Sequence, residues 1–254
     1  MQSPTRTASA SVKSSNFPKL GLMSKQVIIL AAGMGTRLAR PLPKPLTELR
    51  DGRSIMKQQM DNLVHAFGEN FRAMIVVGFK LEAIIERFPE ATFVYNELYD
   101  QTNTSKSLLK ALRASNDGGA LWLNGDVVFD PEVLNRVLPL IESDQSFVVV
   151  NTAKVSDEEV KYTLSADGFI AELSKQVVNG LGEAVGINFV SSTDKQALIR
   201  RLAEVDDQDY FERGLEVGIE SDGLRFQAVD ISDLYAVEVD FAEDLERANE
   251  HFKS

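Results

Sequence analysis

Cysteine is absent from this chain of 254 residues, and histidine occurs only twice. The absence of cysteine excludes disulfide bonds and cysteine-ligated zinc or iron–sulfur centres. The two histidines, His65 and His251, lie far apart in the sequence, so a histidine-rich metal site is not expected. The metal ligands that the chain does offer are carboxylates.

Positive charge is also scarce, because 27 Lys and Arg face 38 Asp and Glu, for a net charge of −11. Nucleic-acid-binding proteins depend on clustered cations, so this balance argues against DNA or RNA as a partner. No apolar run approaches the roughly 20 residues of a membrane span. We therefore expect a cytoplasmic protein without a membrane partner, in which any anionic small substrate is held by local lysines and arginines.

The first 23 residues are rich in Ser, Thr and Ala and contain no aliphatic block long enough for a secretory signal. We expect residues 1–23 to form a disordered tail and residues 24–254 to form one folded domain. Apolar runs at 27–30, 73–77, 92–95, 120–123 and 146–150 alternate with helical patterns at 54–67, 81–88, 105–114 and 131–141. This alternation predicts a Rossmann-like α/β fold, with a mostly parallel sheet and helices on both faces.

The regular alternation of predicted strands and helices ends at about residue 157. Two short apolar segments, 160–164 and 169–173, flank Ala166-Asp167-Gly168, which predicts a β-hairpin. Further strands are expected at 185–190, 224–229 and 234–239, and helices at 193–204, 209–220 and 242–252. We interpret this part as a small β-rich insertion within the same domain. Its edge could serve a homodimer.

The first predicted strand leads directly into a glycine-containing loop. The segment reads Leu30-Ala31-Ala32-Gly33-Met34-Gly35-Thr36-Arg37-Leu38, and Lys44 follows in Pro43-Lys44-Pro45-Leu46. Small residues let backbone N–H groups approach a polyphosphate closely, and two cations can share its charge. The loop therefore predicts a phosphate-binding site, with Arg37 and Lys44 as candidate catalytic residues.

Two common nucleotide motifs fit this loop less well. A dinucleotide-binding fingerprint needs a third glycine and an acidic residue after the next strand, but that strand ends at Gly78-Phe79-Lys80. The G-x-x-x-x-G-K-[ST] motif of a P-loop does not occur. Alternatively, the two glycines could simply form a turn, and the two cations could lie on the surface without binding a ligand.

Three carboxylates are placed to bind a metal ion. Asp126 follows Gly125 at the end of a predicted strand, and the period of two puts Glu238 and Asp240 on one face of another. Together they could form the oxygen cage that Mg²⁺ uses with phosphates. Alternatively, Asp126 could form a turn or cap a helix, and Asp240 could cap the last helix.

Taken together, these motifs resemble those of the nucleoside-triphosphate transferase superfamily, which contains sugar-nucleotide pyrophosphorylases and small-alcohol cytidylyltransferases. The resemblance lies in L-A-A-G-x-G-T-R-L, P-K-P-L, a strand ending in G-D, and E-V-D before F-x-E-D-L-E-R-A. Residues 103–108, and segments between 159 and 187, are similar to cytidylyltransferases for phosphocholine, inositol-1-phosphate and aminoethylphosphonate. The Q-P-x-G-L type loop of the glucose-1-phosphate enzymes is replaced by the different sequence of residues 96–107.

The resemblance implies a Mg²⁺-dependent catalytic domain over residues 24–254 and a role for each matching residue. The residues expected to bind the nucleotide are Leu30, Ala31, Ala32, Gly33, Met34, Gly35, Thr36, Arg37, Lys44, Thr104, Ser107 and Asp126. The expected metal ligands are Asp126, Glu238 and Asp240, and the expected acceptor-binding residues are Lys161, Lys175 and Glu183. Lys161 and Lys175 could instead extend along a sheet edge without facing the site.

We therefore expect an enzyme that joins a nucleoside triphosphate, most readily CTP, to a small phosphorylated alcohol or phosphonate and releases pyrophosphate. Choline is a less suitable acceptor group, because the single tryptophan, Trp122, falls in a predicted buried strand and cannot join an aromatic cage. A sugar-1-phosphate nucleotidyltransferase using UTP, dTTP or GTP is the nearest alternative. A non-catalytic nucleotide-binding regulator and a nicotinamide dehydrogenase are more distant ones.

Overall fold

The computed structural model describes residues 24–35, 38, 41–153, 155 and 159–251. The predicted tail, residues 1–23, and two predicted nucleotide-binding residues, Thr36 and Arg37, lie outside the described residues. The strands are β1 (Lys25–Ala31), β2 (Phe71–Val77), β3 (Thr92–Tyr95), β4 (Ala120–Asn124), β5 (Val127–Phe129), β6 (Phe147–Asn151), β7 (Lys161–Leu164), β8 (Ile170–Ser174), β9 (Glu183–Val190), β10 (Gln227–Asp230) and β11 (Ala236–Glu238). The helices are η2 (Lys44–Leu46), α1 (Ile55–Phe67), α2 (Leu81–Arg87), α3 (Thr104–Ala114), α4 (Glu132–Glu142), α5 (Lys195–Glu204), α6 (Phe211–Asp222) and α7 (Ala242–His251).

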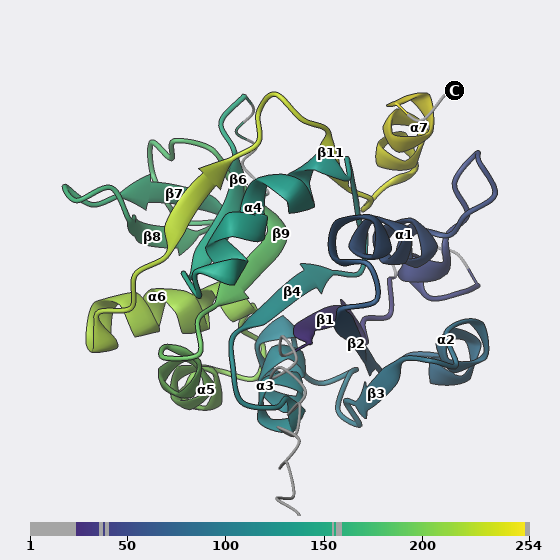
Figure 1. The fold of residues 1–254 in the computed structure, drawn as a ribbon, viewed down its shortest axis with the longest axis horizontal. Helices are drawn as coiled ribbons and strands as arrows, with labels where there is room; N and C mark the ends of the chain where they lie inside the picture. The colour runs from purple at the N-terminus through teal and green to yellow at the C-terminus, as the bar shows by residue number, and fades with distance from the viewer. Residues whose placement is uncertain (1–23, 36–37, 39–40, 154, 156–158, 252–254) are drawn as a thin grey trace, which may run out of the picture.

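A central sheet in the order β10-β6-β9-β4-β1-β2-β3 organises the molecule (Figure 1). Strands β1, β2, β3 and β4 pair in parallel, and so do β6 and β10. Strand β9 runs antiparallel to both β4 and β6, and the hairpin of β7 and β8 joins the sheet beside it. The predicted α/β fold with a mostly parallel sheet and a β-rich addition is thus confirmed.

Helices cover both faces of the sheet because its strands are apolar on both sides. Alternate residues of β1 illustrate this: Ile29 faces a core formed with α1, α2 and α4, and Ile28 faces a core formed with α3, α5 and α6. Both side chains are fully buried. In Figure 1 these two sets of helices lie on opposite sides of the sheet. The site-forming loops therefore extend from a rigid, two-sided core.

Strand β5 was not predicted from the sequence, and strand β11 is shorter than expected. Strand β5 follows β4 after a turn at Gly125 and Asp126 and pairs antiparallel with β11. The sequence predicts a strand over 234–239, but β11 spans only Ala236–Glu238. A strand as short as β5 carries too few residues to show a period, so only its partner across the chain defines it.

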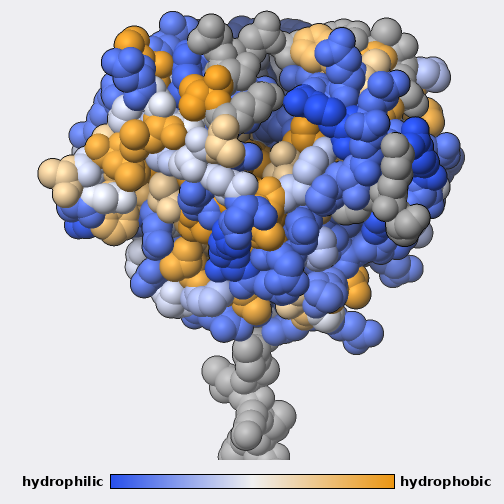
Figure 2. All heavy atoms as spheres, turned by 90° about the horizontal axis from the view of Figure 1, so that it is seen from above, coloured by the Kyte–Doolittle hydropathy of each residue, from blue (hydrophilic) through white to orange (hydrophobic). Residues whose placement is uncertain are grey.

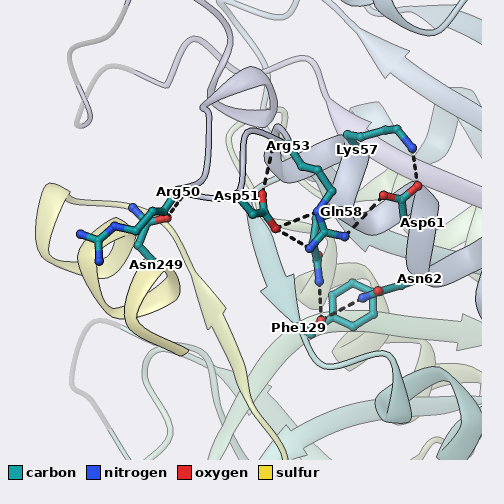
Figure 3. A network of polar contacts seen from close by, with 9 residues as sticks. All are labelled: Arg50, Asp51, Arg53, Lys57, Gln58, Asp61, Asn62, Phe129 and Asn249. Atoms are coloured by element: carbon teal, nitrogen blue, oxygen red, sulfur yellow. Dashed lines mark hydrogen bonds and ion pairs between the residues drawn. The ribbon is translucent and has the colours of Figure 1, made fainter. Parts of the chain in front are cut away.

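Helix α7 is held against the loop before α1. Leu49, Ile55, Val128, Val239 and Leu245 form a third buried cluster with Ala248, which joins this loop, β5 and α7. Polar contacts reinforce it (Figure 3): the backbone N–H of Arg50 donates to Asn249, while Gln58 and Asn62 of α1 both donate to the Phe129 carbonyl. These contacts fix the segment between β11 and α7, which carries Asp240.

Among the described residues, no helix is both long and apolar enough to cross a bilayer. Figure 2 shows one face of the molecule, where hydrophilic residues predominate and apolar ones gather only in separate small patches.

Candidate active site

The carboxyl ends of β1 and β4 meet where the sequence predicts phosphate binding. The Gly125 N–H donates to the Leu30 carbonyl at 2.9 Å, which closes the turn after β4 onto the end of β1. A Cβ at position 125 would come within 2.6 Å of that carbonyl oxygen and 2.9 Å of the Pro45 ring, so only glycine allows this approach. The close turn delivers Asp126 to the loop that carries Lys44.

Lys44 lies at the centre of the site, between two carboxylates. It begins the short helix η2 after Pro43, and its Nζ donates to Asp126 Oδ2 at 2.9 Å and to Asp240 Oδ1 at 2.5 Å. Its side chain is only 11% exposed. Burial lowers the pKa of Lys44, but the two carboxylates outweigh burial and raise that pKa above its usual value. Lys44 is therefore a fixed cation at the end of the glycine loop.

Asp240 is positioned by the start of α7. The Val239 N–H donates to the Asp126 carbonyl at 3.0 Å, so the chain after β11 lies directly beside the turn after β4. Asp244 Oδ2 then accepts from the backbone N–H groups of Asp240 and Phe241, at 3.0 and 2.7 Å. The Asp244 carboxylate thus pairs with two backbone N–H groups at the start of α7, and the Asp240 carboxylate contacts Lys44.

The third predicted metal ligand, Glu238, has a different environment. Its Oε1 accepts from the side-chain amide of Asn124 at 3.0 Å. Burial, followed by the nearby charge of Asp126, raises the pKa of Glu238 well above its ordinary range. Within the described part of the chain, no three Asp, Glu, His or Cys side chains gather closely enough to form a metal cage. The structure brings Asp126 and Asp240 together at one cation, with Glu238 beside them.

Two adjoining cavities open at this point. The first has a volume of about 380 Å³, and of the predicted residues it is lined by Leu30, Ala31, Gly33, Gly35, Lys44, Thr104, Asp126, Lys175, Glu238 and Asp240. The second has a volume of about 700 Å³ and is lined by Glu183, and again by Lys175, Glu238 and Asp240. Lys175 therefore lies where the two cavities meet, on the side formed by the β-rich part.

Four predicted residues do not line either cavity. Ala32 is buried in the sheet, and Met34 is 44% exposed. Ser107 is buried, and its hydroxyl accepts from the Asn96 side chain at 3.0 Å. Lys161 pairs with Ser174 and Glu183 across the strands β8 and β9. Its position corresponds to the sheet-edge alternative.

Sequence reasoning missed several groups on the far side of the first cavity. Glu159, Tyr210, Phe211 and Glu212 all line it. Glu212 is three residues before Leu215 on the buried face of α6, where a helix normally carries an apolar side chain. A carboxylate at that helical position is the signal that could have identified it.

The chain matches the model of the MobA-like NTP transferase domain over residues 27–205. It belongs to this family. The fold, the nucleotidyltransferase class and the enzyme assignment made from the sequence are thereby confirmed.

Among curated relatives, the chain is 27% identical to a CMP-5'-(3-aminopropyl)phosphonate synthase of Streptomyces rubellomurinus over 248 residues. The match covers 89% of this chain but only 38% of that protein, so the chain spans well under half of the relative's length.

Solved structures of the same fold come from enzymes with different nucleotides. The inositol-1-phosphate CTP transferase from T. maritima has a TM-score of 0.72 at 15% identity, covering 91% of this chain and 98% of that chain. The CTP:phosphocholine cytidylyltransferase from Streptococcus pneumoniae has a TM-score of 0.69 at 19% identity, covering 91% and 100%. A UDP-glucose pyrophosphorylase complexed with UDP-glucose also reaches 0.72, at 15% identity and covering 91% and 98%. The fold alone therefore does not determine which nucleotide the transferase uses.

Proposed function

We propose that this transferase is a Mg²⁺-dependent cytidylyltransferase that joins CTP to a small phosphorylated alcohol or phosphonate and releases pyrophosphate. The observation that carries the proposal is Lys44 held between Asp126 and Asp240, in a cavity that the glycine loop also lines. The similarity to a CMP-phosphonate synthase along most of this chain supports both the cytidine nucleotide and the phosphonate acceptor.

The residues present fit a magnesium ion. Asp126 and Asp240 already converge on one cation, the ammonium group of Lys44, and carboxylate oxygens are the ligands that Mg²⁺ prefers. Asp126 and Asp240 would hold the ion, with Glu238 close by. When bound, Mg²⁺ supplies positive charge to phosphate oxygens and helps to align them.

The chain's own residues would carry out the remaining work. The backbone of Gly33 and Gly35 lines the cavity without side chains, so triphosphate oxygens can approach its N–H groups. Lys44 is a permanent cation and would stabilise the negative charge that moves to the leaving pyrophosphate. Lys175, at the junction of the two cavities, would attract the acceptor's anionic group.

The acceptor oxygen would attack the α-phosphorus in line, and the bond from that phosphorus to the pyrophosphate oxygen would break. A phosphate or phosphonate oxygen is already an anion, so no general base is required. Catalysis would then come from positioning and charge stabilisation.

A sugar-1-phosphate nucleotidyltransferase is the second candidate function. It is favoured by the similar fold of the UDP-glucose pyrophosphorylase.

Pyrophosphate release distinguishes the candidates. The protein is incubated with Mg²⁺, each nucleoside triphosphate in turn, and a panel of phosphorylated alcohols, phosphonates and sugar 1-phosphates. We expect the highest rate with CTP and a small phosphate or phosphonate. Release only with a sugar 1-phosphate and UTP, dTTP or GTP would favour the second candidate. Release with no pair would favour a nucleotide-binding regulator.

Two variants connect the activity to this site. We expect Lys44→Ala and Asp126→Ala each to lower kcat/KM on the order of 10²- to 10³-fold, as for other charge-stabilising groups. Lys57→Ala is the matched control, because Lys57 also pairs with a carboxylate, Asp61, but is 53% exposed on α1. Unchanged activity in both site variants would refute the assignment.

A further inference from the structure

The turn between β2 and α2 holds a lysine in an unusual backbone conformation. Lys80 has a φ of 47°, in the left-handed region. The other non-glycine residues with positive φ in the described part of the chain are Asp144 and Asn179, and these two residue types tolerate that region best. Lysine at this position costs backbone free energy that glycine would not cost. Such a residue points to a role for its side chain.

The side chain of Lys80 has two contacts. Its Nζ donates to the backbone carbonyl of Pro41 at 2.5 Å, and it lies 5.4 Å from the centroid of the Phe79 ring. Lys80 is otherwise exposed, so its side chain does not fill a space in the core. The consequence of the hydrogen bond is that Pro41 is attached to the end of β2.

The same turn is also attached to the end of β1. The Phe79 N–H donates to the Ala32 carbonyl at 3.1 Å. A Cβ at Gly78 would lie 2.7 Å from that carbonyl oxygen, so only glycine lets the turn approach Ala32 so closely. The turn after β2 therefore bonds to Ala32, just after β1, and to Pro41, shortly before η2.

The position of Pro41 affects Lys44, the first residue of η2. Two prolines, Pro41 and Pro43, precede Lys44, and proline fixes φ, so few backbone rotations are available to absorb a shift of Pro41. A Cβ at Gly35 would lie 3.1 Å from Lys44 Cβ, so Lys44 also packs closely against the glycine loop. A displacement of Pro41 would thus move Lys44 relative to that loop.

We infer that Lys80 is a positioning residue of the nucleotide site: by holding the Pro41 carbonyl, it keeps Lys44 in contact with Asp126 and Asp240. This inference rests on the proposed function, in which Lys44 stabilises the charge of the leaving pyrophosphate. Lys80 lines neither cavity, so its effect on the reaction passes through Lys44.

The first test removes the hydrogen bond and measures kcat/KM with the best substrate pair of the pyrophosphate assay. Lys80→Met keeps the length of the side chain but has no N–H, and it should lower kcat/KM about 10-fold. Lys80→Arg retains N–H donors and should stay within about threefold of wild type. The matched control is Arg87→Ala, because Arg87 also donates to a backbone carbonyl, that of Ala83 within α2, at 3.1 Å. Unchanged activity in Lys80→Met would overturn the inference.

A double-mutant cycle tests whether Lys80 acts through Lys44. In the Lys44→Ala background, the loss of kcat/KM caused by Lys80→Met should shrink from about 10-fold to less than about twofold. A general loosening of the protein would instead lower kcat/KM by the same factor in both backgrounds. That result would overturn the inference.

Lys80→Gly separates positioning from a role in stability. Glycine accepts the left-handed backbone without cost but lacks the side chain that reaches Pro41. We expect a urea midpoint at or above that of wild type, together with a kcat/KM lowered about 10-fold. A lower urea midpoint with unchanged kcat/KM would show a purely structural residue and overturn the inference.

Hydrogen exchange distinguishes failure of this inference from failure of the proposed function. The N–H groups of Leu46 and Thr47, which donate within η2, should exchange at least about fivefold faster in Lys80→Met than in wild type or Arg87→Ala. This NMR measurement needs neither nucleotide nor turnover. Faster exchange in a protein whose wild type releases no pyrophosphate would refute the proposed function and uphold the positioning role. Unchanged exchange would refute the positioning role, whatever the activity.

Discussion

Replacing Glu212 should stabilise the fold at alkaline pH. The carboxyl group is buried, so its charged form is costly in the folded protein and costs little in the unfolded chain. The Glu212→Gln variant keeps the shape of the side chain and never carries the charge.

The size of the effect follows from the pKa of Glu212. Folding raises this pKa from 4.5 to about 7, and each pH unit between these values corresponds to about 1.4 kcal/mol. The folded state holds the proton of Glu212 more tightly than the unfolded chain does. The contribution of Glu212 to the free energy of unfolding therefore falls as pH rises from about 4.5 to about 7, and it stays low above that range. The variant should therefore gain up to about 3 kcal/mol over wild type between pH 4.5 and 8.5.

Urea unfolding from pH 4.5 to 8.5, followed by fluorescence, measures this difference. The single tryptophan, Trp122, is fully buried and contacts the ring of Phe211 edge-on, with centroids 5.6 Å apart, so its emission reports on the start of α6. The new amide group changes the free energy of unfolding by an amount that does not vary with pH. The informative quantity is therefore the slope, against pH, of the difference in this free energy between variant and wild type. A difference between variant and wild type that stays flat across this range would refute the reasoning.

The remaining predictions concern the metal, the capping acid and the glycines of the site. Chelation by EDTA should abolish pyrophosphate release, and excess Mg²⁺ should restore it; full activity in EDTA would contradict the magnesium proposal. Asp244→Ala should raise the Mg²⁺ concentration needed for half-maximal rate at least about tenfold, because Asp240 loses its backbone support; an unchanged titration would exclude that positioning role. Gly33→Ala should leave the free energy of unfolding within about 0.5 kcal/mol, since nothing lies within 4 Å of the added methyl, yet raise KM for CTP. Gly125→Ala should instead lower the free energy of unfolding by about 1–3 kcal/mol in a urea titration, because its methyl meets the Leu30 carbonyl.

Local patterns were sufficient for most of the fold. The apolar run before the glycine loop became β1, and the helical pattern over 54–67 became α1, where the Ser54 hydroxyl accepts from the Lys57 N–H. The hairpin signal around Gly168 became β7 and β8. Such elements depend on neighbouring residues, so their periods and caps are visible in the chain itself.

Elements defined by distant partners were less visible. The direction of β9, antiparallel to β4 and β6, depends on which strands it lies between. The short β5 is a strand only because β11 pairs with it. The sequence left open whether Asp240 binds a metal ion or caps the last helix. In the structure Asp244, from within the first turn of α7, accepts from the Phe241 N–H.

By itself, the sequence determined the chemistry available to this transferase: a glycine loop for phosphates, a lysine after it, carboxylates near two strand ends, and no cysteine. Only the tertiary structure decided which of these groups meet. Lys44 and Asp240 are 196 residues apart in the chain, yet they form an ion pair, while Glu238, two residues away, binds Asn124 instead. Likewise, only the tertiary structure shows that Glu212 is buried, whereas the other glutamates of α6 are not. The reason is physical, since composition and spacing act locally, whereas distance, solvent exposure and charge neighbours arise only when remote segments pack together.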